Sequence, residues 1–202
     1  MKHEDTGEFQ IRMDSFKMQL EDYANYIKNG SQYLFPRWMV VTGCCNLANA
    51  VQIVRDQFTE NGLEEGKDWF LFEDGNPKPN AIYDLLYDHN ERIVVLNQYK
   101  KLLKGELSYL FWKHLFESSD PKAHDIYVPR DGKNYYDANM LSAKEKYYAE
   151  VNEGKRPNHF KFTGCVVLLT DATTYDFYVT ENKVPNEYIN SLRARALLVM
   201  FE

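Results

Sequence analysis

Near the start of the chain, apolar side chains recur at intervals of three or four residues. These positions are Phe9, Met13, Phe16, Leu20, Tyr23 and Ile27. Such spacing places them on one face of a helix, so the pattern predicts an amphipathic helix over 9–27 that ends at Asn29-Gly30. We therefore expect residues 1–34 to form an N-terminal helical segment.

Short apolar runs then alternate with helical patterns along the rest of the chain. Strands are predicted at 38–42, 68–72, 92–97, 165–170 and 197–201, and helices at 50–61, 80–88, 107–117 and 185–194. The runs without polar interruption are typical of parallel strands that are buried on both faces. The alternation predicts a three-layer α/β fold with a mostly parallel five-stranded sheet, spanning 35–202.

The stretch from about 119 to 159 breaks this alternation. It is charged, rich in tyrosine and interrupted by proline and glycine, so we expect an irregular insertion with one helix near 141–152. Clustered aromatic side chains are frequent anchors of protein interfaces. The candidates for such a role are Tyr135, Tyr136, Tyr147 and Tyr148, which could equally pack back on the sheet.

Composition narrows the function classes. Of 202 residues, 44% are hydrophobic, enough for a substantial core, and the net charge of −6 disfavours a general nucleic-acid binder. Three cysteines, two of them adjacent, fit reduced thiols in the cytoplasm rather than a disulfide framework. The sequence shows neither a signal peptide nor an apolar run of membrane-spanning length, and its five histidines form no metal-ligand pair, so we expect no membrane and no metal.

The most informative motif follows the first predicted strand. That strand leads into a loop that starts at Gly43 and then into a helix, which is the architecture of the phosphate-binding P-loop G-x-x-x-x-G-K-[ST]. In this frame Ala48 replaces the second glycine, Asn49 replaces the lysine and Ala50 replaces the hydroxyl residue. The loop has therefore lost the charge and the oxygen that handle phosphate and magnesium.

The ordered set of segments from about 35 to 201 resembles the AAA+ ATPase domain, within it the small phage-encoded type. The third strand resembles the Walker B strand and ends in Asn97 and Gln98 where the family has two acids. The run 160–171 resembles the sensor 1 strand and ends in Thr170-Asp171 instead of Thr-Asn. Arg195, with Arg193 beside it, resembles the arginine finger, and the helical lid that follows the fifth strand in the family is expected to be missing.

The resemblance implies a nucleotide site that has lost its chemistry. The degenerate positions are Gly43, Cys44, Cys45, Asn46, Ala48, Asn49, Ala50, Asn97, Gln98 and Asp171. Phosphoryl transfer depends on a lysine, a magnesium ion and carboxylates, and each missing group costs a few kcal/mol of barrier. We therefore expect no catalytic residue and no resident cofactor, with weak ATP or phosphate binding at the loop and helix terminus left open.

Three functions are compatible with these observations. The first is a pseudo-ATPase that acts by binding a protein, which could be an active AAA+ subunit, a replication component or a host factor. Arg195 or Arg193 could then be donated in trans to the nucleotide site of an active subunit. Homo-oligomers are also compatible with this function. The second is an ATPase with displaced groups, such as Asp171 as acid and Lys100 or Lys101 as cation. The third is single-stranded nucleic-acid binding through Lys100, Lys101 and Lys104 with the tyrosine-rich stretch.

Overall fold

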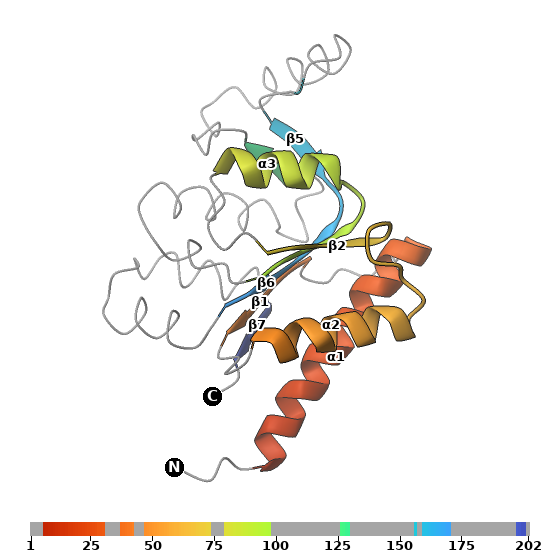
Figure 1. Ribbon diagram of the computed structural model, residues 1–202, viewed down its shortest axis with the longest axis vertical. Helices are drawn as coiled ribbons and strands as arrows, with labels where there is room; N and C mark the ends of the chain where they lie inside the picture. The colour runs from red at the N-terminus through yellow and green to blue at the C-terminus, as the bar shows by residue number, and fades with distance from the viewer. Residues whose placement is uncertain are drawn as a thin grey trace, which may run out of the picture.

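Five parallel strands form the centre of the molecule. The computed structural model describes residues 6–30, 37–42, 47–73, 79–97, 126–129, 156, 159–170 and 197–200. The strands are β1 (Trp38–Thr42), β2 (Trp69–Phe72), β3 (Ile93–Leu96), β6 (Cys165–Leu169) and β7 (Leu197–Met200). They are hydrogen-bonded in the order β2-β3-β6-β1-β7, and every neighbouring pair is parallel (Figure 1). The predicted α/β class with a parallel sheet is confirmed.

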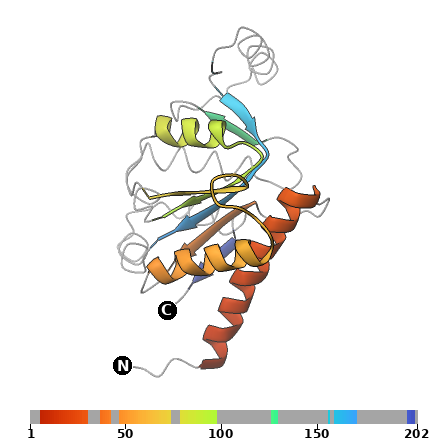
Figure 2. The same ribbon diagram turned by 45° about the vertical axis from the view of Figure 1, so that its right-hand side comes forward.

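Three helices lie among the described residues. α2 (Leu47–Glu60) follows β1, α3 (Pro79–Asp88) lies between β2 and β3, and α1 (Thr6–Asn29) precedes the sheet in sequence. α1 and α2 pack on the same face of the sheet. Figure 2 shows α1 crossing α2 beside the sheet. None of the described helices is long and apolar enough to cross a bilayer. The helices predicted at 107–117, 141–152 and 185–194 lie outside the described residues.

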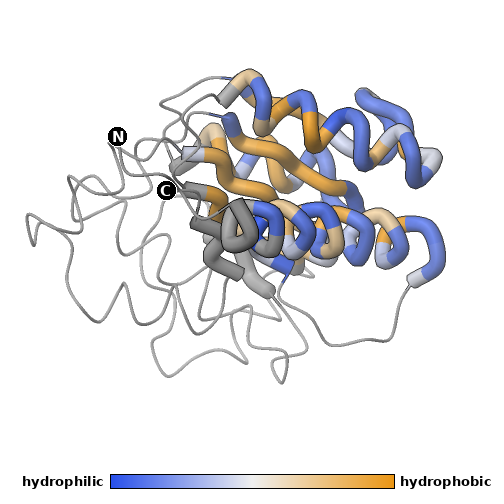
Figure 3. The backbone as a smooth tube through the Cα atoms, turned by 90° about the horizontal axis from the view of Figure 1, so that it is seen from below, coloured by the Kyte–Doolittle hydropathy of each residue, from blue (hydrophilic) through white to orange (hydrophobic). Residues whose placement is uncertain are grey.

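The central strands β1, β3 and β6 are buried on both faces, which explains their uninterrupted apolar runs. Met39 and Val41 belong to a core cluster with the apolar faces of α1 and α2, including Phe16 and Phe58. Val40, which points the other way from β1, is just as completely buried. Alternate residues of a strand face opposite sides, so a strand covered on both must be apolar at every position. Figure 3 shows this contrast between mostly apolar strands and helices of alternating hydropathy.

A second, smaller sheet corrects the expectation for the 119–159 stretch. β4 (Ile126–Pro129) pairs antiparallel with β5 (His159–Phe162), and Ile126 lies opposite Phe162. We name these two strands the ribbon. The expectation of an irregular segment with a single helix missed β4, and the run that resembles a sensor 1 strand is divided into β5 and β6 at Thr163-Gly164.

The division between β5 and β6 depends on the glycine. A Cβ atom at Gly164 would lie 2.2 Å from the backbone oxygen of Arg92, far inside van der Waals contact. That oxygen accepts a hydrogen bond of 3.0 Å from the backbone N–H of Cys165, so the close approach belongs to the pairing of β6 with β3. Only glycine lets the chain pass here from the ribbon into the large sheet.

Candidate functional site

The carboxyl ends of β1, β6 and β3 meet at one edge of the sheet. All three strands are parallel and adjacent, and they end beside Thr42, Thr170 and Asn97 respectively. After β1 the chain continues to β2, at one edge of the sheet, and after β6 it continues to β7, at the opposite edge. The connections from these two adjacent strands therefore run in opposite directions. In open α/β sheets, ligands bind outside the carboxyl ends at such a switch point. We call this place the carboxyl edge.

Asn97 lies directly after β3 and is only 6% exposed. Its backbone N–H donates a 2.9 Å hydrogen bond to the carbonyl oxygen of Phe72 in β2, which fixes its position at the end of the strand. Its side-chain Oδ1 is buried and has no hydrogen-bond partner among the described residues. A buried polar atom without a partner costs about 1–3 kcal/mol, so this residue is not explained by stability alone.

Thr170 repeats this arrangement at the end of β6. It is 1% exposed, and its backbone N–H donates a 2.9 Å hydrogen bond to the carbonyl oxygen of Val41 in β1. Its Oγ1 is also buried without a partner in the described part of the chain. Two adjacent strands are thus followed by neutral polar side chains whose oxygens are not bonded to any described residue.

The first turn of α2 supplies the remaining described positions of the loop motif. Ala48 and Asn49 are exposed, whereas Ala50 is buried in the core cluster. The first turn of α2 contains no acidic residue that would oppose an anion. The backbone N–H groups and dipole of a helix N-terminus favour negative charge, but Asn49 adds no charge and Ala50 adds no oxygen. The described residues of this turn therefore offer phosphate only the helix terminus itself.

The chemistry open to the carboxyl edge is restricted. An asparagine side chain cannot act as a general base, and the described residues contain no group of histidine, cysteine or acidic side chains that could hold a metal ion. Cys165, the described cysteine, is no substitute nucleophile, because complete burial raises the pKa of its thiol far above the usual value. The described residues of the edge, Asn97 and Thr170, offer neutral donors and acceptors.

Several predicted site residues cannot be placed. The candidates outside the described residues are Gly43, Cys44, Cys45, Asn46, Gln98, Asp171, Arg193, Arg195, Tyr135, Tyr136, Tyr147 and Tyr148. Asn97 lies at the same edge of the sheet as the start of α2. We predicted Asp171, and not Thr170, as a site residue. The signal for Thr170 was available, since it is the first polar residue after the apolar run of β6.

No protein-family model, curated protein or solved structure matches this chain. A function for this protein must therefore be inferred from the residues at the carboxyl edge and from the parallel sheet that positions them.

Proposed function

We propose that this protein is a catalytically inactive, AAA+-like α/β domain that acts by binding another protein. The observation that carries the proposal is the side-chain chemistry of the carboxyl edge. A neutral amide, Asn97, ends β3 at the position where a magnesium-binding carboxylate would be needed, beside the neutral hydroxyl of Thr170.

The number of missing electrostatic groups supports the proposal that the protein does not hydrolyse ATP. Magnesium selects anionic oxygen ligands, and the amide oxygen of Asn97 is a poor replacement. Asn49 has no charge to offer the β and γ phosphates, and Ala50 has no hydroxyl to offer the metal. Each such electrostatic contribution is worth about 3–4 kcal/mol of barrier, so losing them together reduces the rate by many powers of ten.

The retained scaffold supports a role in protein contact. The central strands β3 and β6 and residues 38–41 of β1 are fully buried, so the fold keeps its core although the groups for chemistry are missing. We expect the partner to be an active AAA+ subunit, a replication component or a host protein. The tyrosines of the 119–159 stretch are the proposed contacts, with Arg195 as a group donated in trans.

A phosphate-release assay with ATP and magnesium, combined with calorimetry, tests inactivity. We expect no turnover above background from the wild-type chain. Asn49→Lys should strengthen ATP binding about tenfold, because a charge-assisted hydrogen bond adds about 1.5 kcal/mol or more. Asn25→Lys adds the same charge at an exposed position of α1 and is the matched control, with no gain expected. Magnesium-dependent turnover by the wild-type chain would refute the proposal.

Metal-independent nucleotide binding is a second candidate function. It is favoured by the two buried oxygens without partners, of Asn97 and Thr170, on the edge that also holds the N-terminus of α2. Titration with ATP in excess EDTA measures it, and Thr170→Val should weaken binding severalfold because only the hydroxyl is removed. Equal heats for the two chains would exclude Thr170 from the site.

The protein-binding role has its own test. Affinity purification from the source cells should recover a defined partner with the wild-type chain, and the double variant Tyr135→Ala/Tyr136→Ala should lose it. Tyr26→Phe is the control, because it changes a tyrosine of α1 that is bonded within the domain: its hydroxyl donates to the carbonyl oxygen of Thr163 at 2.9 Å. Equal recovery by all three chains would remove these tyrosines from the interface.

A further inference from the structure

A single arginine connects the end of the inserted stretch to α3. The guanidinium of Arg156 donates from Nη1 to Oδ1 of Asp84, and from Nη2 to both carboxylate oxygens of Asp88 at 2.7 and 2.9 Å. The two acids are one helical turn apart, and the ring of Tyr87 lies between them in sequence. The guanidinium carbon lies 5.2 Å from the centroid of that ring, within cation–π range.

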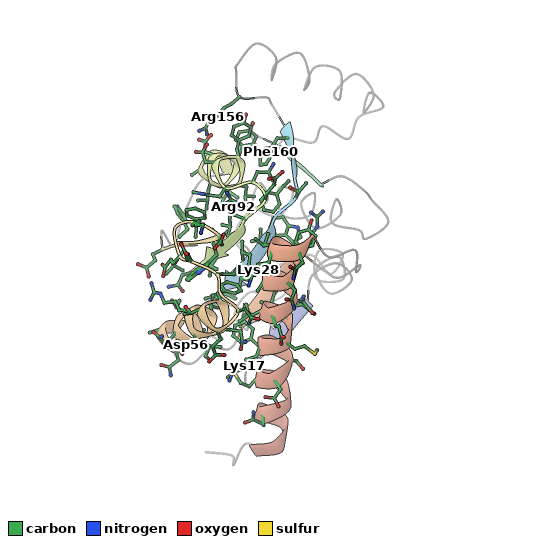
Figure 4. The ribbon with its side chains drawn as sticks, turned by 90° about the vertical axis from the view of Figure 1, so that its right-hand side faces the viewer. Lys17, Lys28, Asp56, Arg92, Arg156 and Phe160 are labelled. Atoms are coloured by element: carbon green, nitrogen blue, oxygen red, sulfur yellow. The ribbon has the colours of Figure 1, made fainter. Side chains whose placement is uncertain are left out.

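This contact is continuous with an aromatic cluster that reaches the core. The ring of Tyr87 packs edge-on against Phe160 of β5 at 5.2 Å, and Phe160 packs against Phe162 at 6.4 Å. Phe162 in turn contacts Trp38, the first residue of β1, at 6.1 Å. Figure 4 shows Arg156 and Phe160 beside α3 at one end of the molecule. Arg156 thus covers the outer end of the contact between α3 and the ribbon.

The two parts of this contact differ in strength and in sensitivity to salt. Phe160 and Phe162 are fully buried, and apolar burial of this kind is large and independent of charge screening. The Arg156 pairs are partly exposed, with 38% of the arginine side chain and about half of each carboxylate accessible, so each is weak and salt-sensitive. Loss of the ionic pairs should therefore free the end of the ribbon at His159 and Pro129, while Phe160 and Phe162 stay packed.

We propose that Arg156 is a salt-sensitive latch that fastens the end of the inserted stretch to α3, and that its release frees the His159–Pro129 end of the ribbon. Tyr147 and Tyr148, which are assigned to partner contact, precede Arg156 in the sequence, and in this respect the inference rests on the proposed protein-binding function.

Residue-resolved amide hydrogen exchange of the full chain tests the latch without a partner or nucleotide. Arg156→Gln should raise exchange at His159, Phe160 and the last turn of α3 about fivefold, the factor expected from losing an exposed ionic cluster. Raising the salt concentration should have the same effect on the wild-type chain. Exchange at Phe162 and in β1 should stay unchanged, because the aromatic cluster remains.

Two further variants keep the test specific. Asp88→Asn removes the bidentate partner from α3 and should raise exchange at the same amides. Arg55→Gln is the matched control, since Arg55 forms a comparably exposed pair with Glu65 at 3.1 Å, far from α3 in sequence. Unchanged exchange in Arg156→Gln would overturn the latch, and so would a uniform rise across the sheet. Neither result bears on ATP turnover, which tests the proposed function separately.

Discussion

The two ends of the parallel sheet bond their oxygens differently. At the amino end, Oδ1 of Asn90 accepts from the backbone N–H groups of Thr163 and Glu91 at 2.9 and 3.0 Å. The carbonyl oxygen of Phe162 accepts from Arg37 at the same end. At the carboxyl edge, the side-chain oxygens of Asn97 and Thr170 are buried without partners among the described residues. The contrast holds for these oxygens and not for every polar group, because Nε1 of Trp69 at the amino end of β2 is also buried without such a partner. We call the amino end the structural end and the carboxyl edge the proposed functional end.

The largest effect should come from the structural end. Gly164→Ala forces a methyl group into the backbone of Arg92, so the β5–β6 turn or β3 must move, and we expect a loss of about 3 kcal/mol or more in the free energy of unfolding. Chemical denaturation measures it.

Gly30→Ala is the matched control for that substitution. Gly30 has a φ of 59° but open space around its Cβ position, so only conformational strain of about 1 kcal/mol should appear. Equal losses in the two variants would show that the close approach at Gly164 does not constrain the sheet.

Side-chain deletions should sharpen the contrast between the two ends. Asn90→Ala leaves the N–H groups of Thr163 and Glu91 without their acceptor and should cost about 1–2 kcal/mol. Thr170→Val removes a hydroxyl that bonds to none of the described residues and should change stability by less than about 0.5 kcal/mol, or increase it. Thermal unfolding of both variants measures the difference. A Thr170→Val loss as large as that of Asn90→Ala would remove the distinction between the two ends.

Most of the sheet could be predicted from the sequence because its signal is local. β1, β3 and β6 are apolar at successive positions, as only strands covered on both faces need to be. β4 was missed because its four residues lie in a charged stretch and depend on pairing with β5 across a long separation in sequence. The contact of Arg156 with Asp84 and Asp88 is equally non-local, since no spacing rule connects residues so far apart.

Of the two buried polar residues at the carboxyl edge, Asn97 could be predicted from the sequence, again because its signal is local. Asn97 ends an apolar strand, so its place at the carboxyl edge follows once the strands are parallel. The order β2-β3-β6-β1-β7, which sets Thr170 between the ends of β1 and β3, is a property of the whole sheet. Whether a buried oxygen finds a hydrogen-bond partner also depends on three-dimensional packing. The sequence could therefore point to Thr170, but it could not predict that its hydroxyl bonds to none of the described residues.

The smallest expected effect is a pH dependence confined to the structural end. His89 stacks on Phe70 with ring centroids 3.7 Å apart, and burial lowers its pKa below the usual 6.5, with Asp88 opposing the shift and Arg92 adding to it. The unfolded chain therefore binds a proton more readily than the folded one. This contribution to stability is complete above about pH 6.5 and is lost as the pH falls through the folded-state pKa. Asn97 and Thr170 do not titrate, so these two residues should contribute no dependence of stability on pH in this range.

Urea unfolding between pH 7.5 and 5.5 should show wild-type stability declining more steeply than that of His89→Gln, by under about 1 kcal/mol in total. Parallel curves for the two chains would mean that His89 is as easily protonated in the folded domain as in the unfolded chain, and that stacking on Phe70 does not exclude the charge.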